Sequence, residues 1–227
     1  MLNRVYELET AIMRSTARKA ELKEAVAQAK YALRQANIAQ VEYSGIRAFL
    51  DKLSGKFADK EESLIRNVRK AEAERSLLEQ QLEAESRKLS ELLAQRAGLP
   101  PLEQLRASEN RELWAPLEIQ YCTEAIAPLL DRLEEALTQY RQMLRGEIPM
   151  LSVSQQQVIS SAPISAAQAC QPLLQRLEAA GADLPNTDFF RSPAGFLAAA
   201  ARHNQLNQAA EAAAQTARLK KKLYPHL

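Results

Sequence analysis

The strongest constraint on the fold is a spacing of three and four residues that runs through the first 43 residues. Its positions are Val5, Leu8, Ile12, Ser15, Lys19, Leu22, Val26, Ala29, Leu33, Ala36, Gln40 and Tyr43, and nine of these twelve are apolar. Alternating steps of three and four place side chains on one face of an α-helix, and a long run of them is typical of positions a and d of a coiled coil. The sequence therefore predicts a long helix that packs along a partner helix.

The same spacing returns later in the chain and predicts a second long helix. Its positions are Glu61, Leu64, Val68, Ala71, Arg75, Leu78, Leu82, Glu85, Leu89 and Leu92. If the chain doubles back between the two repeats, Lys19 can face Glu85 in one layer of the seam. A slip by one heptad would strand both charges against apolar side chains, so this pair would set the register. We predict an antiparallel coiled-coil hairpin over residues 1–97, with Lys19 and Glu85 as the register-setting pair.

The segment between the two repeats, residues 44–60, is the predicted tip of the hairpin. Its apolar residues have the i, i+3, i+4, i+7 spacing of a short amphipathic helix, with glycines on both sides. In one interpretation this face only covers the open end of the seam. In the other it also docks a partner, and the candidate partner-binding residues are Ile46, Arg47, Phe49, Leu50, Lys52, Leu53, Lys56 and Phe57.

Small residues widen the apolar face of the first predicted helix. The heptad positions beside the seam are Ala11, Arg18, Ala25, Ala32 and Ala39, and the alanines make the apolar face wider than one partner helix covers. The sequence leaves two occupants open for this stripe: a later helix of the same chain, or the same helix of a second copy.

The rest of the chain divides into three predicted segments. Residues 98–145 are expected to form a third helix that packs on the hairpin base, with a break near Pro116 and a kink near Pro128. Residues 146–165 are rich in serine and glutamine and lack a helical period, so they are predicted to be a linker. Residues 166–227 are expected to contain the C-terminal helices.

The C-terminal segment has its own helix signals. A short helix is expected from about Ala166 to Ala180. Ser192 and Pro193 then suit the start of an alanine-rich helix that continues to about Leu223. The neighbouring residues Phe189, Phe190 and Phe196 are expected to pack this last helix against the rest of the protein.

Composition supports an all-α fold and limits the partners. The 227 residues include only six glycines, whereas alanine, leucine, glutamate, glutamine, lysine and arginine dominate. Thirty basic and 28 acidic residues nearly balance, so no nucleic-acid partner is expected. Cys122 and Cys170 form no CxxC pair, and no apolar run has the roughly 18 residues of a membrane span. A cytoplasmic location is expected.

The chain carries no pattern that predicts catalysis. His203 and His226 lack the nearby ligands of a zinc or di-metal site, and the glycines do not form a phosphate-binding loop. We therefore predict a protein that is not an enzyme and has no cofactor or bound metal.

These observations favour a non-catalytic structural or interaction protein, a spacer or adaptor whose partners are proteins, a second copy (homodimer) among them. A less favoured alternative is a peripheral membrane scaffold that binds anionic lipid through the basic tip or the basic C-terminus, residues 218–222. A third hypothesis is an enzyme or small-ligand binder with a pocket near Trp114 and Tyr121.

Overall fold

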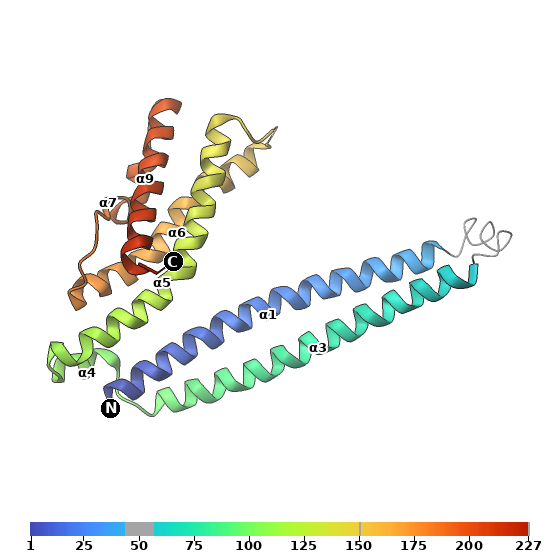
Figure 1. Ribbon diagram of the computed structural model, residues 1–227, viewed down its shortest axis with the longest axis horizontal. Coiled ribbons are helices and arrows are strands. Elements are labelled where there is room, and N and C mark those ends of the chain that lie inside the picture. The colour runs from blue at the N-terminus through green and yellow to red at the C-terminus, as the bar shows by residue number, and fades with distance from the viewer. Residues whose placement is uncertain (44–56, 150, 227) are drawn as a thin grey trace. The chain divides into compact units, whose positions relative to one another are not determined.

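The computed structural model describes residues 1–43, 57–149 and 151–226, and every helix or strand element in that part of the chain is an α-helix. The all-α prediction is therefore confirmed. The helices, shown in Figure 1, are α1 (Leu2–Glu42), α3 (Phe57–Ala97), α4 (Leu102–Ser108), α5 (Arg111–Arg145), α6 (Val153–Ala180), α7 (Asp188–Arg191), α8 (Pro193–Leu197) and α9 (Arg202–Leu223).

The chain forms two compact units. The two-helix unit comprises residues 7–100, and the multi-helix unit comprises residues 1–6 together with residues 101–227. The boundary falls within α1, so the first turn of that helix belongs to the multi-helix unit.

In the two-helix unit, α1 and α3 lie side by side and run in opposite directions (Figure 1). Arg96 Nε lies 2.6 Å from the Glu9 carboxylate near one end of the pair. Farther along, Lys30 Nζ lies 3.2 Å from Glu79 Oε1. The residue number rises along α1 while it falls along α3, which is the pairing of antiparallel helices.

Burial along α1 follows the predicted apolar spacing through its first three quarters. Leu22, Val26 and Leu33 are buried, but Gln40 is exposed. The corresponding positions of α3 are half-buried from Leu64 to Leu92, and Glu61 is exposed. Of the predicted alanine stripe, Ala32 and Ala39 are exposed.

The multi-helix unit has a core in which α5 packs against α6 and α9. Fully or almost fully buried side chains from these helices and from α7 fill it: Ile126, Leu130, Leu133, Leu137, Cys170, Leu177, Phe189, Phe190, Ala209, Ala212 and Leu219. The α9 contribution is mainly alanine, and small side chains allow close approach of helix backbones. Phe189 contacts Phe190 and Phe196 edge to face, with ring centroids 5.3 and 5.5 Å apart.

Helix α6 corrects the predicted linker over residues 146–165, because it begins at Val153 and continues to Ala180. Ser152 starts it with a capping box: its hydroxyl accepts from the Gln155 backbone, and the Gln155 side chain accepts from the Ser152 backbone. Serine and glutamine dominate this segment, but Ile159, Pro163 and Ala167 recur every four residues, as on one face of a helix. Ile159 is half-buried, and Pro163 and Ala167 are buried. The predicted helix from 166 to 180 is the C-terminal half of α6.

The predicted break near Pro116 lies elsewhere in the structure. The chain breaks between α4 and α5, at residues 109–110, and α5 runs through both Pro116 and Pro128. Pro116 leaves the Glu112 carbonyl without its usual helical donor, and residue 112 is exposed, so water can supply the hydrogen bond.

The predicted single helix from Pro193 to about Leu223 is divided into α8 and α9. Residues 198–201 separate the two helices, and Ala198 and Ala201 have extended backbone conformations. The Gln205 side chain donates a hydrogen bond of 3.1 Å to the Ala199 carbonyl, which loses its helical partner at the break. Alanine favours a helix by only a few tenths of a kcal/mol per residue, roughly, so a local side-chain contact can override it.

Two helix ends depend on glycine, and we predict that Gly146→Ala and Gly181→Ala both destabilise the protein. These residues end α5 and α6 with φ of 73° and 84°, a left-handed conformation that costs a residue with a Cβ about 1–2 kcal/mol. Urea unfolding followed by circular dichroism measures the loss. Gly98→Ala is the control, since a Cβ there meets only the Gln95 carbonyl at an ordinary 3.6 Å. Equal stability of all three variants would contradict the prediction.

Candidate functional site

A buried carboxylate forms the polar centre of the multi-helix unit. Glu118, on α5, has no exposed surface. Its Oε2 accepts a hydrogen bond from the Tyr6 hydroxyl at 2.5 Å and another from Arg106. Its Oε1 accepts from Arg176 Nε at 2.5 Å and from the Cys122 thiol at 3.4 Å. We call these five residues the Glu118 cluster.

The cluster gathers side chains from four helices. Arg106 is on α4, Glu118 and Cys122 are one turn apart on α5, and Arg176 is on α6. Tyr6 comes from the first turns of α1, in the part of that helix that belongs to the multi-helix unit. The carboxylate thus connects four segments that are far apart in the sequence.

Aromatic rings surround the two arginines. The Arg176 guanidinium lies 4.8 Å from the centroid of the Tyr121 ring, and the Arg106 guanidinium lies 5.5 Å from that of Trp114. Such cation–π contacts stabilise a guanidinium that has lost part of its water. The structure therefore brings Trp114 and Tyr121, the residues of the predicted pocket, to the edge of the Glu118 cluster.

The pKa values in the cluster reflect burial and mutual pairing. Burial alone would raise the pKa of Glu118, but hydrogen bonds from Arg176 and Tyr6 outweigh it and hold that pKa below its ordinary value. Burial, reinforced by the hydrogen bond to Glu118, raises the pKa of Tyr6 to about 12. Burial and then the Glu118 charge raise the pKa of the Cys122 thiol to about 12.

This chemistry suits structural pairing. A nucleophilic cysteine needs a lowered pKa and access, whereas Cys122 is fully buried and remains a thiol at neutral pH. Both oxygens of Glu118 already accept hydrogen bonds from the protein. The arrangement holds helices together, and a sequence signal for it existed: Glu118 lies one turn before Cys122 on the apolar face of α5.

The predicted register pair of Lys19 and Glu85 is not joined by an ion pair among the described residues. Glu85 Oε1 instead accepts a hydrogen bond of 2.6 Å from the buried Ser15 hydroxyl and lies 3.5 Å from Lys88 Nζ. The hydrogen bond from Ser15, followed by the Lys88 charge, lowers the pKa of Glu85 even though partial burial opposes the shift. Lys19 is half-buried, and in the described part of the chain it is not in ion-pair contact with Glu85. The charge of Glu85 is accommodated by a neighbouring serine and by its own helix.

The predicted tip residues fall outside the described structure. Ile46, Arg47, Phe49, Leu50, Lys52, Leu53 and Lys56 lie in the segment 44–56, and Phe57 is described only as the first residue of α3. Partner docking by the tip stays a prediction.

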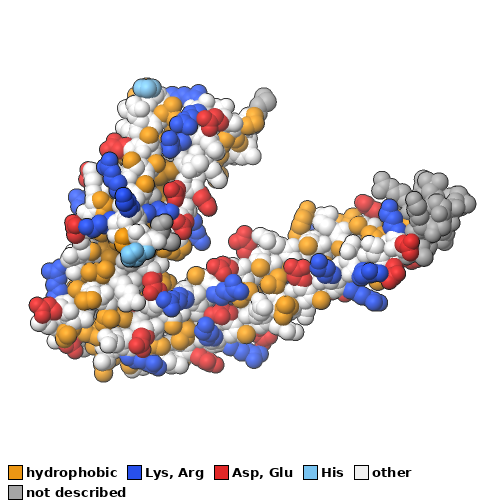
Figure 2. All heavy atoms as spheres, viewed as in Figure 1, with side chains coloured by type: hydrophobic (Ala, Val, Ile, Leu, Met, Phe, Trp, Pro, Cys, Tyr) orange, Lys and Arg blue, Asp and Glu red, His pale blue; other side chains and the backbone are white. Residues whose placement is uncertain are grey.

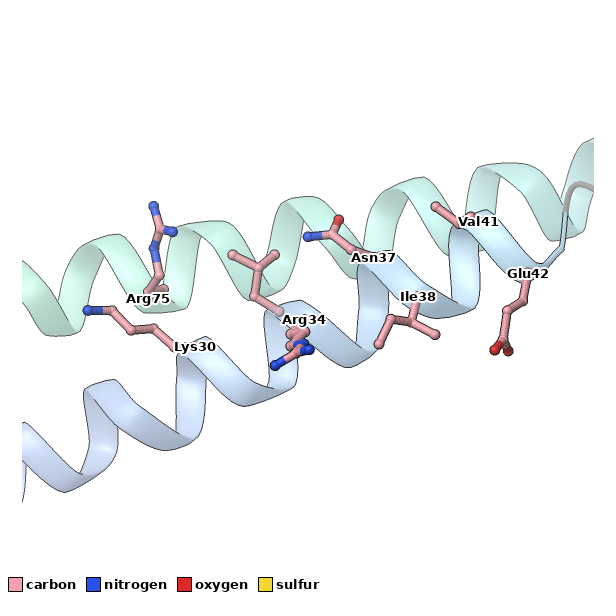
Figure 3. Close-up of a pocket in the computed structure, with 8 residues that line it drawn as sticks. Lys30, Arg34, Asn37, Ile38, Val41, Glu42 and Arg75 are labelled. Atoms are coloured by element: carbon pink, nitrogen blue, oxygen red, sulfur yellow. The ribbon is translucent and has the colours of Figure 1, made fainter.

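A groove lies on the two-helix unit, along the second half of α1. Its volume is about 680 Å³, and Figure 3 shows most of its lining residues in order along α1, with Arg75 on α3. The lining residues are Lys30, Leu33, Arg34, Asn37, Ile38, Val41, Glu42 and Arg75. We call this feature the α1 groove.

The α1 groove combines aliphatic surface with an excess of positive charge. Val41 is 71% exposed and Ile38 is 38% exposed. Lys30, Arg34 and Arg75 outnumber the single lining carboxylate of Glu42. In the space-filling view, hydrophobic side chains are interspersed with charged side chains of both signs along the two-helix unit (Figure 2).

Two of the four basic residues at the C-terminus form ion pairs within the protein, whereas Arg218 and Lys221 are exposed. Lys220 Nζ lies 2.9 Å from Asp131 and 2.6 Å from Glu134, and Lys222 Nζ lies 2.6 Å from Asp183. Hydrogen bonds to Glu134 and Asp131 raise the pKa of Lys220. These pairs reduce the charge that the C-terminus could offer to anionic lipid.

No cluster of three or more histidine, cysteine, aspartate or glutamate side chains suitable for a metal ion occurs among the described residues. Nor does any helix in those ranges combine the length and the apolar character that crossing a membrane requires.

Comparison with known proteins gives no family. No protein-family model matches this chain, and neither the curated proteins nor the solved structures contain a significant match.

We predict that Glu118→Gln lowers the free energy of unfolding by about 3–5 kcal/mol, because it leaves two guanidinium groups without their shared anion. Tyr6→Phe removes one hydrogen bond to the carboxylate and should cost less, about 1.5–3 kcal/mol. Urea unfolding measures both. Glu135→Gln, an exposed position on α5, is the control and should change stability by about 0.5 kcal/mol or less. Similar effects at positions 118 and 135 would contradict the structural role.

The effect of Glu118→Gln should depend on pH. Because folding lowers the pKa of Glu118 from 4.5, its ionised form stabilises the fold above about pH 4.5, and this contribution disappears as the pH falls through the lower folded-state pKa. The stability difference between wild type and Glu118→Gln should therefore shrink as the pH falls from about 7 to about 3. A difference that stays constant over this range would show that the charge of Glu118 is not involved.

Proposed function

We propose that this chain is a non-catalytic interaction protein, a spacer or adaptor, in which α1 and α3 form an antiparallel coiled-coil hairpin that presents a docking surface to another protein. The observation that carries the proposal is the α1 groove, in which Ile38 and Val41 remain exposed to solvent. Clustered exposed aliphatic side chains in a concave site commonly mark a surface that binds another protein.

The dimensions of α1 and α3 support the spacer component. Each helix has 41 residues, which corresponds to about 60 Å at 1.5 Å per residue. Two helices packed side by side leave much of each helix surface uncovered, so a protein partner has access to it along most of that length.

The Glu118 cluster supports a stable attachment for the first turn of α1. Tyr6 donates a hydrogen bond to a carboxylate that is also held by α4 and α6.

The membrane-scaffold alternative receives less support. Its C-terminal component depends on lysines that pair with Asp131, Glu134 and Asp183 in the described structure. The pocket hypothesis at Trp114 is also weakened, since the neighbouring polar groups already pair with one another.

The docking proposal predicts position-specific crosslinking in the native cell. A photo-crosslinking amino acid, p-benzoylphenylalanine, at position 41 should give a discrete crosslinked protein, because Val41 lines the α1 groove. The same probe at position 77, an exposed leucine of α3 that does not line the groove, is the matched control. Identical products from both positions, or none from position 41, would overturn the proposal.

A further inference from the structure

We infer that the α1 groove binds an amphipathic helix of a partner protein whose polar flank is acidic. This inference rests on the proposed function and specifies the chemistry of the partner. Three observations carry it: the apolar surface, the charges around it, and one arginine nitrogen without a hydrogen-bond acceptor.

The apolar surface has the form that an amphipathic helix recognises. Leu33 is nearly buried at the contact between α1 and α3, whereas Ile38 and Val41 are exposed and complete the aliphatic lining. Helices bind such grooves through apolar residues spaced i, i+3 or i+4, and i+7. The lining runs from Lys30 to Glu42, about 18 Å along the helix, which matches roughly three turns of a bound helix.

The charges around the apolar surface favour an acidic occupant. Arg34 is exposed and has no ion pair with any described residue. Lys30 and Arg75 share the Glu79 carboxylate, at 3.2 and 3.7 Å, so one anion serves two cations. Additional carboxylates from a partner would complete this pairing, and complementary charge also accelerates association.

Arg75 provides the most specific observation. Its Nε is covered from solvent and lacks a hydrogen-bond acceptor in the described part of the chain. The Glu79 oxygen 3.7 Å away is beyond hydrogen-bond distance. A buried donor without an acceptor is costly, so a movement of the Arg75 side chain that brings Nε within reach of a carboxylate in the groove would be favourable.

The groove also has a direction. Figure 3 shows Lys30 and Arg75 at one end, Arg34 next to them, and Glu42 at the opposite end. The acidic residues of the bound helix therefore belong at the end that lies over Lys30 and Arg75, and its other end should be neutral or basic. A second copy of this groove is a poorer match, because the two grooves together would bring six lining cations against only two lining carboxylates.

Fluorescence anisotropy with two labelled peptides tests the inference on the full-length protein. The probe is an amphipathic peptide of about 15 residues with leucines at helical spacing and glutamates on the flanks of one half; its analogue has lysines in place of the glutamates. We expect the acidic peptide to bind and the lysine analogue to bind at least about tenfold more weakly. Val41→Ser and Arg34→Glu should each weaken binding of the acidic peptide by about tenfold or more.

Matched variants keep the test specific. Leu77→Ser and Arg87→Glu change exposed residues of α3 outside the groove and should leave peptide affinity unchanged. Equal binding of both peptides, or equal losses in the groove and control variants, would overturn the acidic-helix inference.

Two other occupants of the groove have their own tests. A dimer in light scattering that Val41→Ser dissociates would overturn the inference in favour of a second copy. Flotation with phosphatidylserine vesicles that depends on Val41 would overturn it in favour of a lipid surface. If the acidic peptide fails to bind while crosslinking from position 41 persists, only the acidic-helix inference fails; if both fail, the proposed function fails too.

Discussion

Burial of the Glu118 carboxylate imposes the central requirement on the multi-helix unit. An ionised carboxylate without exposed surface is tolerated only if the protein replaces the water it has lost. Here Arg106, Arg176 and the Tyr6 hydroxyl do so, and these groups come from α4, α6 and α1. The helices must therefore lie where these side chains can reach the two carboxylate oxygens of Glu118. This requirement restricts the arrangement of the helices more narrowly than apolar packing alone would.

The two-helix unit follows a different constraint. Two helices can bury only the side chains along the line where they touch. On α1 most of these side chains are buried up to Leu33, and the later positions are more exposed. The aliphatic and basic residues of the α1 groove lie in this less covered half. The property that limits the stability of a two-helix element, a large exposed surface, is also what makes such an element suitable for binding a partner.

Sequence reasoning predicted the long helices from a local spacing, but it missed one local signal at the start of α6 and the contacts of Glu118 with distant segments. The heptad spacing predicted two long helices, and the structure contains α1 and α3 over those residues. The pairing of Lys19 with Glu85 stays a prediction: Glu85 accepts a hydrogen bond from Ser15, which lies one turn before Lys19 on the same helix. The helical start of α6 at Val153 was missed, although the Ser152 and Gln155 capping box was readable in the sequence.

The sequence by itself determined that the chain is helical, because helix propensity and the spacing of three and four residues act over a few neighbours. It also determined where glycines end α5 and α6, since a left-handed residue is a local requirement. Only the tertiary structure decided that Glu118 is buried between two arginines and that Arg75 Nε lacks an acceptor. Both depend on side chains that meet from segments far apart in the chain, and no local pattern encodes such a meeting.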